Sequence, residues 1–179
     1  MRLAAFIVSN VESILMDWEV FARSITPGAK MDSLALRDHA QDILLATVQD
    51  MKSSQSVPER AAKSKGRGDS AAAGAAVNGA SELHAIGRLG SGFDLMEVVS
   101  EYRALRASVL ELWRESLPAA DVHDVDDLTR FNESIDQSVA KAVSSYTKRV
   151  DQARDMFLAI LSHDLRNPLN SIAMSAEAL

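Results

Sequence analysis

His163 and Asp164, near the end of the chain, are the pair of side chains best suited to chemistry. A neutral imidazole is a competent nitrogen nucleophile near neutral pH. An adjacent carboxylate can fix its tautomer and raise the basicity of the attacking nitrogen. Asn167 follows one helical turn later on the same face, and Pro168 lacks an N–H, so that a helix tends to bend there. The pattern predicts an activated histidine beside a helix bend; the alternative is an ordinary surface histidine near a kink.

The run from Phe157 to Pro168 has an aromatic and aliphatic lead-in, followed by His, Asp, Arg, Asn and Pro in order. It resembles the H-box of sensor histidine kinases. By this resemblance His163 accepts the γ-phosphoryl group of ATP and passes it to an aspartate of a response regulator. Asp164 would assist the attack, and Asn167 would orient a water molecule for the reverse, dephosphorylating reaction.

Kinases of this kind also have a second antiparallel helix and a domain that binds ATP and Mg²⁺, and the sequence contains neither. We therefore expect a truncated piece of a longer kinase that binds no cofactor by itself. Its catalytic ATP-binding domain would be a partner. Without that domain the chain is expected not to autophosphorylate.

The composition favours a soluble, helical protein. Of 179 residues, 47% are hydrophobic and 25% charged, which is typical of globular domains. The net charge of −6 argues against a nucleic-acid partner. The absence of cysteine excludes disulfides and thiolate metal sites. No run of about 20 apolar residues is present to span a membrane, so we expect a cytoplasmic location.

Apolar residues at three- and four-residue spacing predict helices along the first 120 residues. The first covers residues 3–25, the second begins at Asp32 or Ser33, and a long third begins near Asp94 after a glycine-marked corner. A short helix is expected just before that corner.

Residues 52–80 are rich in Ser, Gly, Ala and Lys and have few large apolar side chains. Such a segment buries too little surface to offset the entropy of ordering it. It is predicted to be a mobile loop with a short helical patch near residues 71–76. Its basic residues, Lys63, Lys65 and Arg67, are interpreted as solvated, with an anion site as the alternative.

A last helix should begin at Asp121 or Asp124, because acidic residues are favourable at the N-terminal end of a helix. No Gly or Pro interrupts the chain from Leu128 to the H-box, so this helix should be continuous. Its apolar residues form a stripe with heptad spacing and one extra four-residue step near Tyr146. The stripe consists of Ile135, Val139, Ala142, Tyr146, Val150, Ala153, Phe157 and Ile160. A helix of about 55 residues at about 1.5 Å per residue would be about 80 Å long. We expect it to pair with a second copy as a coiled-coil homodimer.

A second resemblance involves the first 120 residues. The first part of this resemblance is the segment at residues 31–40. Its more specific part consists of His84, Gly87, Arg88, Gly92, Phe93, Asp94, Glu101, Tyr102, Arg103 and Arg106. The region is similar to the RsbRD-type N-terminal domain, a globin-like, haem-free sensor module of stressosome proteins and of some histidine kinases. The resemblance implies an all-α, dimerising sensor.

Six polar residues of this region are candidates for a buried network, because buried charges must be paired. They are His84, Arg88, Glu101, Tyr102, Arg103 and Arg106. A haem ligand is the alternative role for His84. A histidine that is bonded to a neighbouring helix or lies near the surface is favoured over it. Asp38, His39 and Asp42 are interpreted as part of a solvated helix face. A metal site at these three residues is the less favoured alternative, so no metal is predicted.

The predicted fold is all-α: a globin-like bundle over 1–120, a signalling coiled coil over 121–155, and the first part of a phosphoacceptor domain over 156–179. The predicted function is the sensory and phosphoacceptor portion of a cytoplasmic two-component histidine kinase. The first alternative is a stressosome-like dimeric scaffold without kinase activity. The second is a phosphotransfer protein that is phosphorylated in trans.

Overall fold

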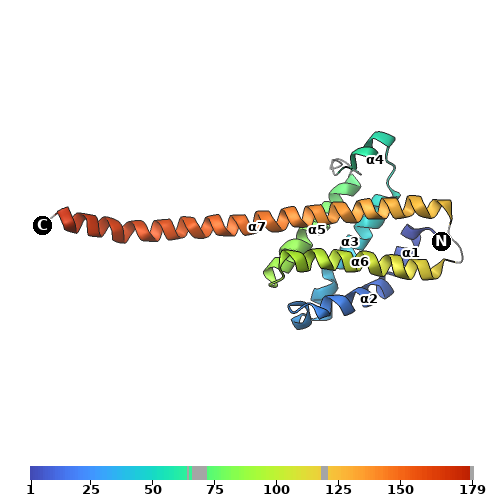
Figure 1. The fold of residues 1–179 in the computed structure, drawn as a ribbon, viewed down its shortest axis with the longest axis horizontal. Helices are drawn as coiled ribbons and strands as arrows, with labels where there is room; N and C mark the ends of the chain where they lie inside the picture. The colour runs from blue at the N-terminus through green and yellow to red at the C-terminus, as the bar shows by residue number, and fades with distance from the viewer. Residues whose placement is uncertain (64, 66–71, 118–120, 178–179) are drawn as a thin grey trace. The chain divides into compact units, whose positions relative to one another are not determined.

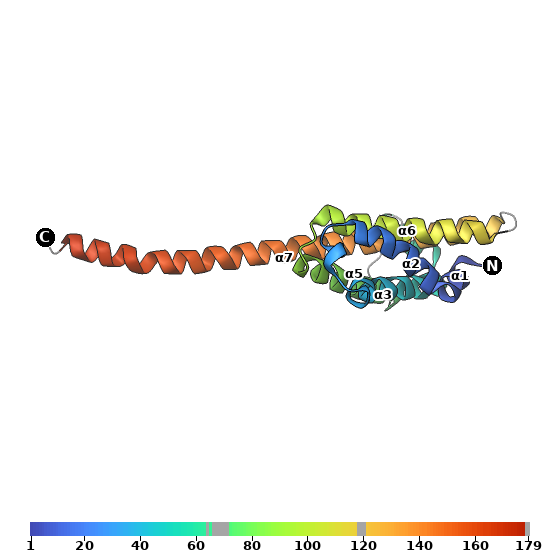
Figure 2. The same cartoon turned by 90° about the horizontal axis from the view of Figure 1, so that it is seen from below.

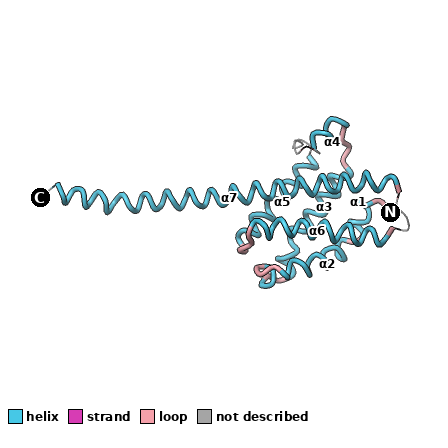
Figure 3. The backbone as a smooth tube through the Cα atoms, in the orientation of Figure 1, coloured by secondary structure: helices cyan, strands magenta, loops and turns pink. Residues whose placement is uncertain are grey.

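A computed structural model describes residues 1–63, 65, 72–117 and 121–177; the side chains of Asp38, Val57, Arg60, Ala72, Ala73 and residues 167–177 lie outside the description. Every regular element in the described part is a helix, as Figure 3 shows, which confirms the all-α prediction.

Residues 1–146 form one compact unit and residues 147–179 a second. The elements are α1 (Leu3–Ser9), α2 (Val11–Ser24), the 3₁₀ turn η1 (Gly28–Lys30), α3 (Ser33–Lys52), α4 (Val57–Lys63), α5 (Ala72–Gly90), α6 (Leu95–Ser116) and α7 (Val122–Glu177).

The helix predicted over residues 3–25 is broken at Asn10, so that part of the prediction was wrong. The backbone there leaves the helical region, with φ −128° and ψ 20°. The Asn10 side-chain amide donates to the carbonyl of Phe6 at 2.8 Å. An asparagine side chain that bonds to the local backbone offers an alternative to the helical ladder, and hydrophobic periodicity does not reveal it.

The predicted starts of two helices are confirmed by their caps. The N–H of Ala35 donates to the Asp32 carboxylate at 2.8 Å at the start of α3. Asp94 and Glu97 form a reciprocal capping box at the start of α6. The predicted glycine corner between α5 and α6 contains Gly92, whose φ of +87° is favourable only for glycine.

Two helices occupy parts of the segment that was predicted to be a loop. α4 spans Val57–Lys63, and α5 spans Ala72–Gly90, so that the predicted helical patch near 71–76 and the short helix predicted before the corner are parts of one continuous helix. Alanine is the best helix former, and small residues let α5 pack closely on α3. Lys63 pairs with Asp50, whereas Lys65 is exposed and Arg67 lies outside the described residues. The loop prediction failed because it counted large apolar side chains and ignored close packing of small ones.

The core of the first unit lies between α2, α3, α5 and α6, with α2 beside α6 (Figure 1 and Figure 2). Its largest fully buried side chains include Trp18, Phe93 and Tyr102. The beginning of α7 contributes Phe131 and Ile135, both buried against the same core. Burying each such side chain contributes about 1.5–3 kcal/mol.

The coiled-coil prediction for α7 therefore needs correction over its first half. Ile135 and Ala142, which were predicted to face a second copy, are buried inside the first unit. Arg130 also donates to the backbone carbonyl of Ser53 at 2.6 Å. Asp127 is buried and accepts from Arg2 at 2.8 Å and from the N–H of Leu3 at 2.9 Å. The stripe up to residue 146 is covered by its own chain.

Asp127 shows how this attachment is held electrostatically. Burial alone would raise the pKa of its carboxyl group, but the hydrogen bond from Arg2 and the N–H of Leu3 outweigh burial and hold the pKa below its usual value. The charged form is therefore the one that fixes the N-terminal residues to α7.

Glu19 of α2 is a second buried carboxylate that is held by hydrogen bonds and ion pairs. It accepts from the hydroxyl of Ser33 and from Arg23, both at 2.8 Å, and it pairs with Arg37. The Ser33 hydrogen bond first, and then the two arginines, lower the pKa of Glu19 to about 2 although burial opposes them. A lowered pKa stabilises the fold above the usual carboxyl pKa of about 4.3, and this contribution is lost as the pH falls toward about 2.

We expect Glu19→Gln to lower the free energy of unfolding by about 2 kcal/mol at pH 7. The loss should be smaller at pH 3, because the contribution of the wild-type carboxylate to the free energy of unfolding is already reduced at that pH. Urea unfolding at the two pH values measures both quantities. Glu12→Gln, at an exposed carboxylate with one ion pair to Arg37, is the control and should have little effect. An equal loss at both pH values would contradict the assignment.

Candidate functional site

The His163–Asp164 pair lies on α7 within the second unit. The His163 side chain is 76% exposed and that of Asp164 69% exposed. The Nδ1 atom of His163 lies 3.2 Å from Oδ1 of Asp164. When Nδ1–H donates to this carboxylate, Nε2 carries the lone pair. The structure therefore presents an accessible nitrogen nucleophile whose other ring nitrogen has a carboxylate partner.

Large apolar side chains near His163 are also open to solvent. Phe157 is 62% exposed and Ile160 56% exposed, in the segment that leads to the histidine. Arg166 is exposed as well. The side chains of Asn167 and Pro168 lie outside the described residues, although the backbone of α7 continues through both. The predicted helix bend and the role of Asn167 stay predictions.

An exposed histidine with a carboxylate partner on a helix has the groups that a phosphoacceptor or another nucleophilic site requires. Comparison with protein families then gives a specific match: residues 153–179 match the family model of the His Kinase A (phospho-acceptor) domain. The match supports the assignment of this segment to the phosphoacceptor part of a histidine kinase. Searches of curated proteins and of solved structures found no significant match to the chain.

A second set of predicted residues comes together in the core of the first unit. Nε of Arg88, on α5, donates to both carboxylate oxygens of Glu101, on α6, at 2.8 and 2.9 Å. Nε2 of His84 lies 3.1 Å from Oε2 of the same carboxylate. The Tyr102 ring packs edge-on against His84 with ring centroids 5.3 Å apart. All four side chains are almost completely buried, and we call them the buried cluster.

Charge in the buried cluster is balanced by one cation and one anion. Arg88 also donates from Nη2 to the carbonyl of Leu36 on α3 at 2.6 Å. Burial lowers the pKa of His84, and the opposing influence of Glu101 does not overcome it. Burial likewise raises the pKa of the Tyr102 phenol well above its usual range. The favoured state of His84 is therefore neutral, beside the ion pair of Arg88 and Glu101.

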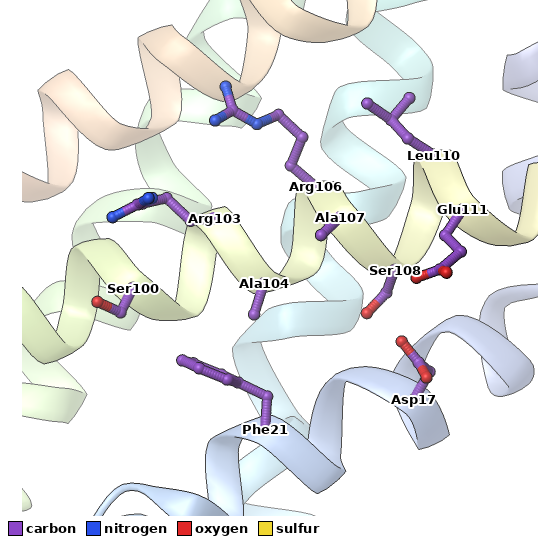
Figure 4. A pocket seen from close by; sticks show the side chains of 10 residues that line it. All are labelled: Asp17, Phe21, Ser100, Arg103, Ala104, Arg106, Ala107, Ser108, Leu110 and Glu111. Atoms are coloured by element: carbon purple, nitrogen blue, oxygen red, sulfur yellow. The ribbon is translucent and has the colours of Figure 1, made fainter.

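Arg103 and Arg106 do not join the buried cluster. A residue two positions along a helix from Glu101 is rotated by about 200°, which puts Arg103 on the exposed side of α6. Arg106 reaches Asp136 of α7 at 3.7 Å. Both arginines instead line an open groove of about 610 Å³ along α6, together with Phe21 and Asp17 of α2 (Figure 4).

The tertiary structure places Trp18, His39 and Phe93 around the buried cluster as well. The indole N–H of Trp18 donates to the carbonyl of Glu101 at 3.0 Å. The His39 ring lies 6.2 Å from the ring of His84, and the guanidinium of Arg88 lies 4.9 Å above the ring of Phe93. No local signal predicts these pairings, because the partners are far apart in sequence.

Within the described part of the chain, no group of three His, Cys, Asp or Glu side chains lies close enough together to hold a metal ion. The Asp38 side chain, one member of the disfavoured metal triad, lies outside the description. No helix among the described residues is both long and apolar enough to cross a membrane. The prediction that the chain binds no haem stays a prediction.

Proposed function

We propose that the chain is the sensory and phosphoacceptor portion of a two-component histidine kinase in the cytoplasm. The observation that carries the proposal is the exposed His163–Asp164 pair, 3.2 Å apart, inside the segment that matches the phosphoacceptor family. The proposed product is phosphohistidine at His163, from which the phosphoryl group passes to an aspartate of a response regulator.

In the proposed step, the lone pair on Nε2 of His163 attacks the γ-phosphorus of ATP. A nitrogen–phosphorus bond forms while the bond to the bridging oxygen breaks, and ADP leaves with that oxygen. The positive charge that develops on the ring is compensated by Asp164 at Nδ1. A separate ATP-binding domain supplies the nucleotide, and Mg²⁺ there neutralises charge on the transferred group. Asn167 is proposed to serve dephosphorylation, and Pro168 to permit a bend.

The first unit is proposed to be the sensor. Support comes from the RsbRD-like residues of its sequence and from the buried cluster, which joins α3, α5 and α6 through charged side chains. Buried ionic groups are poor sources of stability compared with apolar packing, so a role in signalling explains their presence better. The exposed apolar side chains of the second unit support pairing with a second copy.

Labelling with radioactive ATP tests the proposal. The chain is mixed with a catalytic ATP-binding domain from a related kinase, and acid-labile phosphate on the chain is measured. We expect label on the wild type, none on His163→Gln, and unchanged labelling of His123→Gln, which alters another exposed histidine of α7. The chain without the added domain should take up no label.

Equal labelling of His163→Gln and wild type would contradict the assignment of the acceptor. No label on any variant, with the dimer intact, would favour the scaffold function instead.

A further inference from the structure

The environment of His84 is unusual because four helices meet there with their polar groups turned inward. His39 faces it from α3, Arg88 lies one turn away on α5, and Glu101 and Tyr102 face it from α6. α2 contributes Trp18, which does not titrate. The titratable groups around His84 are therefore one carboxylate, one guanidinium, one phenol and a second imidazole.

Nδ1 of His84 is a buried polar atom that has no hydrogen-bond partner among the described residues. Unsatisfied buried groups are uncommon and call for an explanation. The space between His84, Tyr102 and Trp18 has no room for a water molecule. A proton is a ligand that needs no such room, and Nδ1 of a neutral His84 is free to accept one.

Protonation would change the charge balance of the core. Arg88 and Glu101 form an ion pair in which the Nε–H of Arg88 is shared between the two carboxylate oxygens at 2.8 and 2.9 Å. A proton on His84 adds a second cation beside Arg88. The carboxylate of Glu101 is then the counter-charge for two buried cations. The lowered pKa of His84 agrees with this conflict, since burial opposes the charged form. A separation of α5 and α6 that admitted water would relieve this conflict, because water would solvate the added charge.

The cluster is linked to α7 through the corner between α5 and α6. The guanidinium of Arg88 lies over the ring of Phe93 in that corner. The hydroxyl of Tyr146, on α7, donates to the backbone carbonyl of Phe93 at 3.0 Å. Tyr146 is the last residue of the first unit, and α7 continues without a break into the unit that contains His163.

We propose that His84 is a proton-binding site, and that its protonation loosens the Arg88–Phe93–Tyr146 link and so changes α7 where it leaves the first unit. This inference rests on the proposed sensor function and specifies its input as a proton. Neutral pH keeps the link closed, and acidification opens it.

Nuclear magnetic resonance of the full chain tests the binding site directly. The chain has four histidines, so each ring can be assigned with single His→Gln variants. We expect the ring signal of His84 to titrate at lower pH than a free imidazole, because burial opposes the charged form, and to do so within the acidic range over which the chain stays folded. A His84 ring that stays unprotonated over this range, or a chain that unfolds before it titrates, would overturn the proposal.

Hydrogen exchange over the same pH range tests the link. We expect the protection factors of amides 147–155 to fall severalfold as His84 is protonated. In Tyr146→Phe the His84 titration should persist but the fall in protection should vanish, because only the hydroxyl bond to Phe93 is removed. His123→Gln is the matched control and should behave as wild type.

The same fall in protection in His84→Gln or in Tyr146→Phe would overturn the link. Neither experiment uses ATP or depends on His163. A failure here is therefore distinguishable from a failure of phosphorylation, which is measured at one pH with labelled nucleotide.

Discussion

Glu101→Leu should lower the free energy of unfolding by about 3–5 kcal/mol, because it leaves the buried Arg88 without a counter-charge. Small domains have total stabilities of about 5–15 kcal/mol, so the variant should be close to unfolding. Arg88 would keep only its bonds to the Leu36 carbonyl and the Met31 sulfur, and His84 would lose its carboxylate partner. Urea unfolding followed by far-ultraviolet circular dichroism measures the loss.

The double variant Arg88→Met with Glu101→Leu separates the charge effect from lost packing. Replacing both members of a buried ion pair by apolar side chains of similar size is often neutral. We therefore expect the double variant to regain most of the stability lost in Glu101→Leu. Glu111→Leu makes the same substitution at an exposed position of α6 and should change little. A double variant no more stable than Glu101→Leu would show that lost packing, and not the unpaired charge of Arg88, causes the loss.

Phe157→Glu combined with Ile160→Glu should convert the dimer that we propose for this chain into a monomer. Both side chains are large, apolar and more than half exposed, and both belong to the heptad stripe of α7. Exposed apolar patches on soluble proteins mark interaction sites. Two carboxylates per chain would put four like charges into the dimer seam, where they repel one another and resist burial. Analytical ultracentrifugation measures the mass, which we expect to fall by half.

Leu158→Glu is the matched control for the dimer seam. Leu158 is also exposed and apolar, but it is rotated by about 120° from the mean direction of the stripe. We expect this variant to remain dimeric. A wild-type chain that is monomeric at all measurable concentrations, or a Leu158→Glu chain as monomeric as the double variant, would refute pairing through the stripe.

Sequence patterns predicted the helical elements where local chemistry decides them. The starts of α3 and α6 follow from Asp32 and Asp94, whose side chains accept from backbone N–H groups three residues away. The corner at Gly92 follows from the conformational freedom of glycine. The break at Asn10 was missed, because a single side-chain bond decides it and an uninterrupted apolar stripe runs across it.

The two large errors concern partners that lie far away in sequence. The beginning of α5 is poor in large apolar residues, and its helix is stabilised by packing on α3. The heptad spacing of α7 predicts one continuous dimer interface. In the structure, however, Ile135 and Ala142 are buried in the core of the first unit, whereas Phe157 and Ile160 are exposed to solvent. Periodicity shows which face of a helix is apolar and does not show what covers it.

The sequence by itself determined the candidate phosphoacceptor site, because His163 and Asp164 are adjacent residues and their contact needs only a helix. Only the tertiary structure brought His84 and Arg88 to Glu101, and left Arg103 and Arg106 outside. The reason is physical: neighbours along one helix are set by the 3.6-residue repeat, whereas contacts between helices depend on how side chains of α2, α3, α5 and α6 pack in three dimensions.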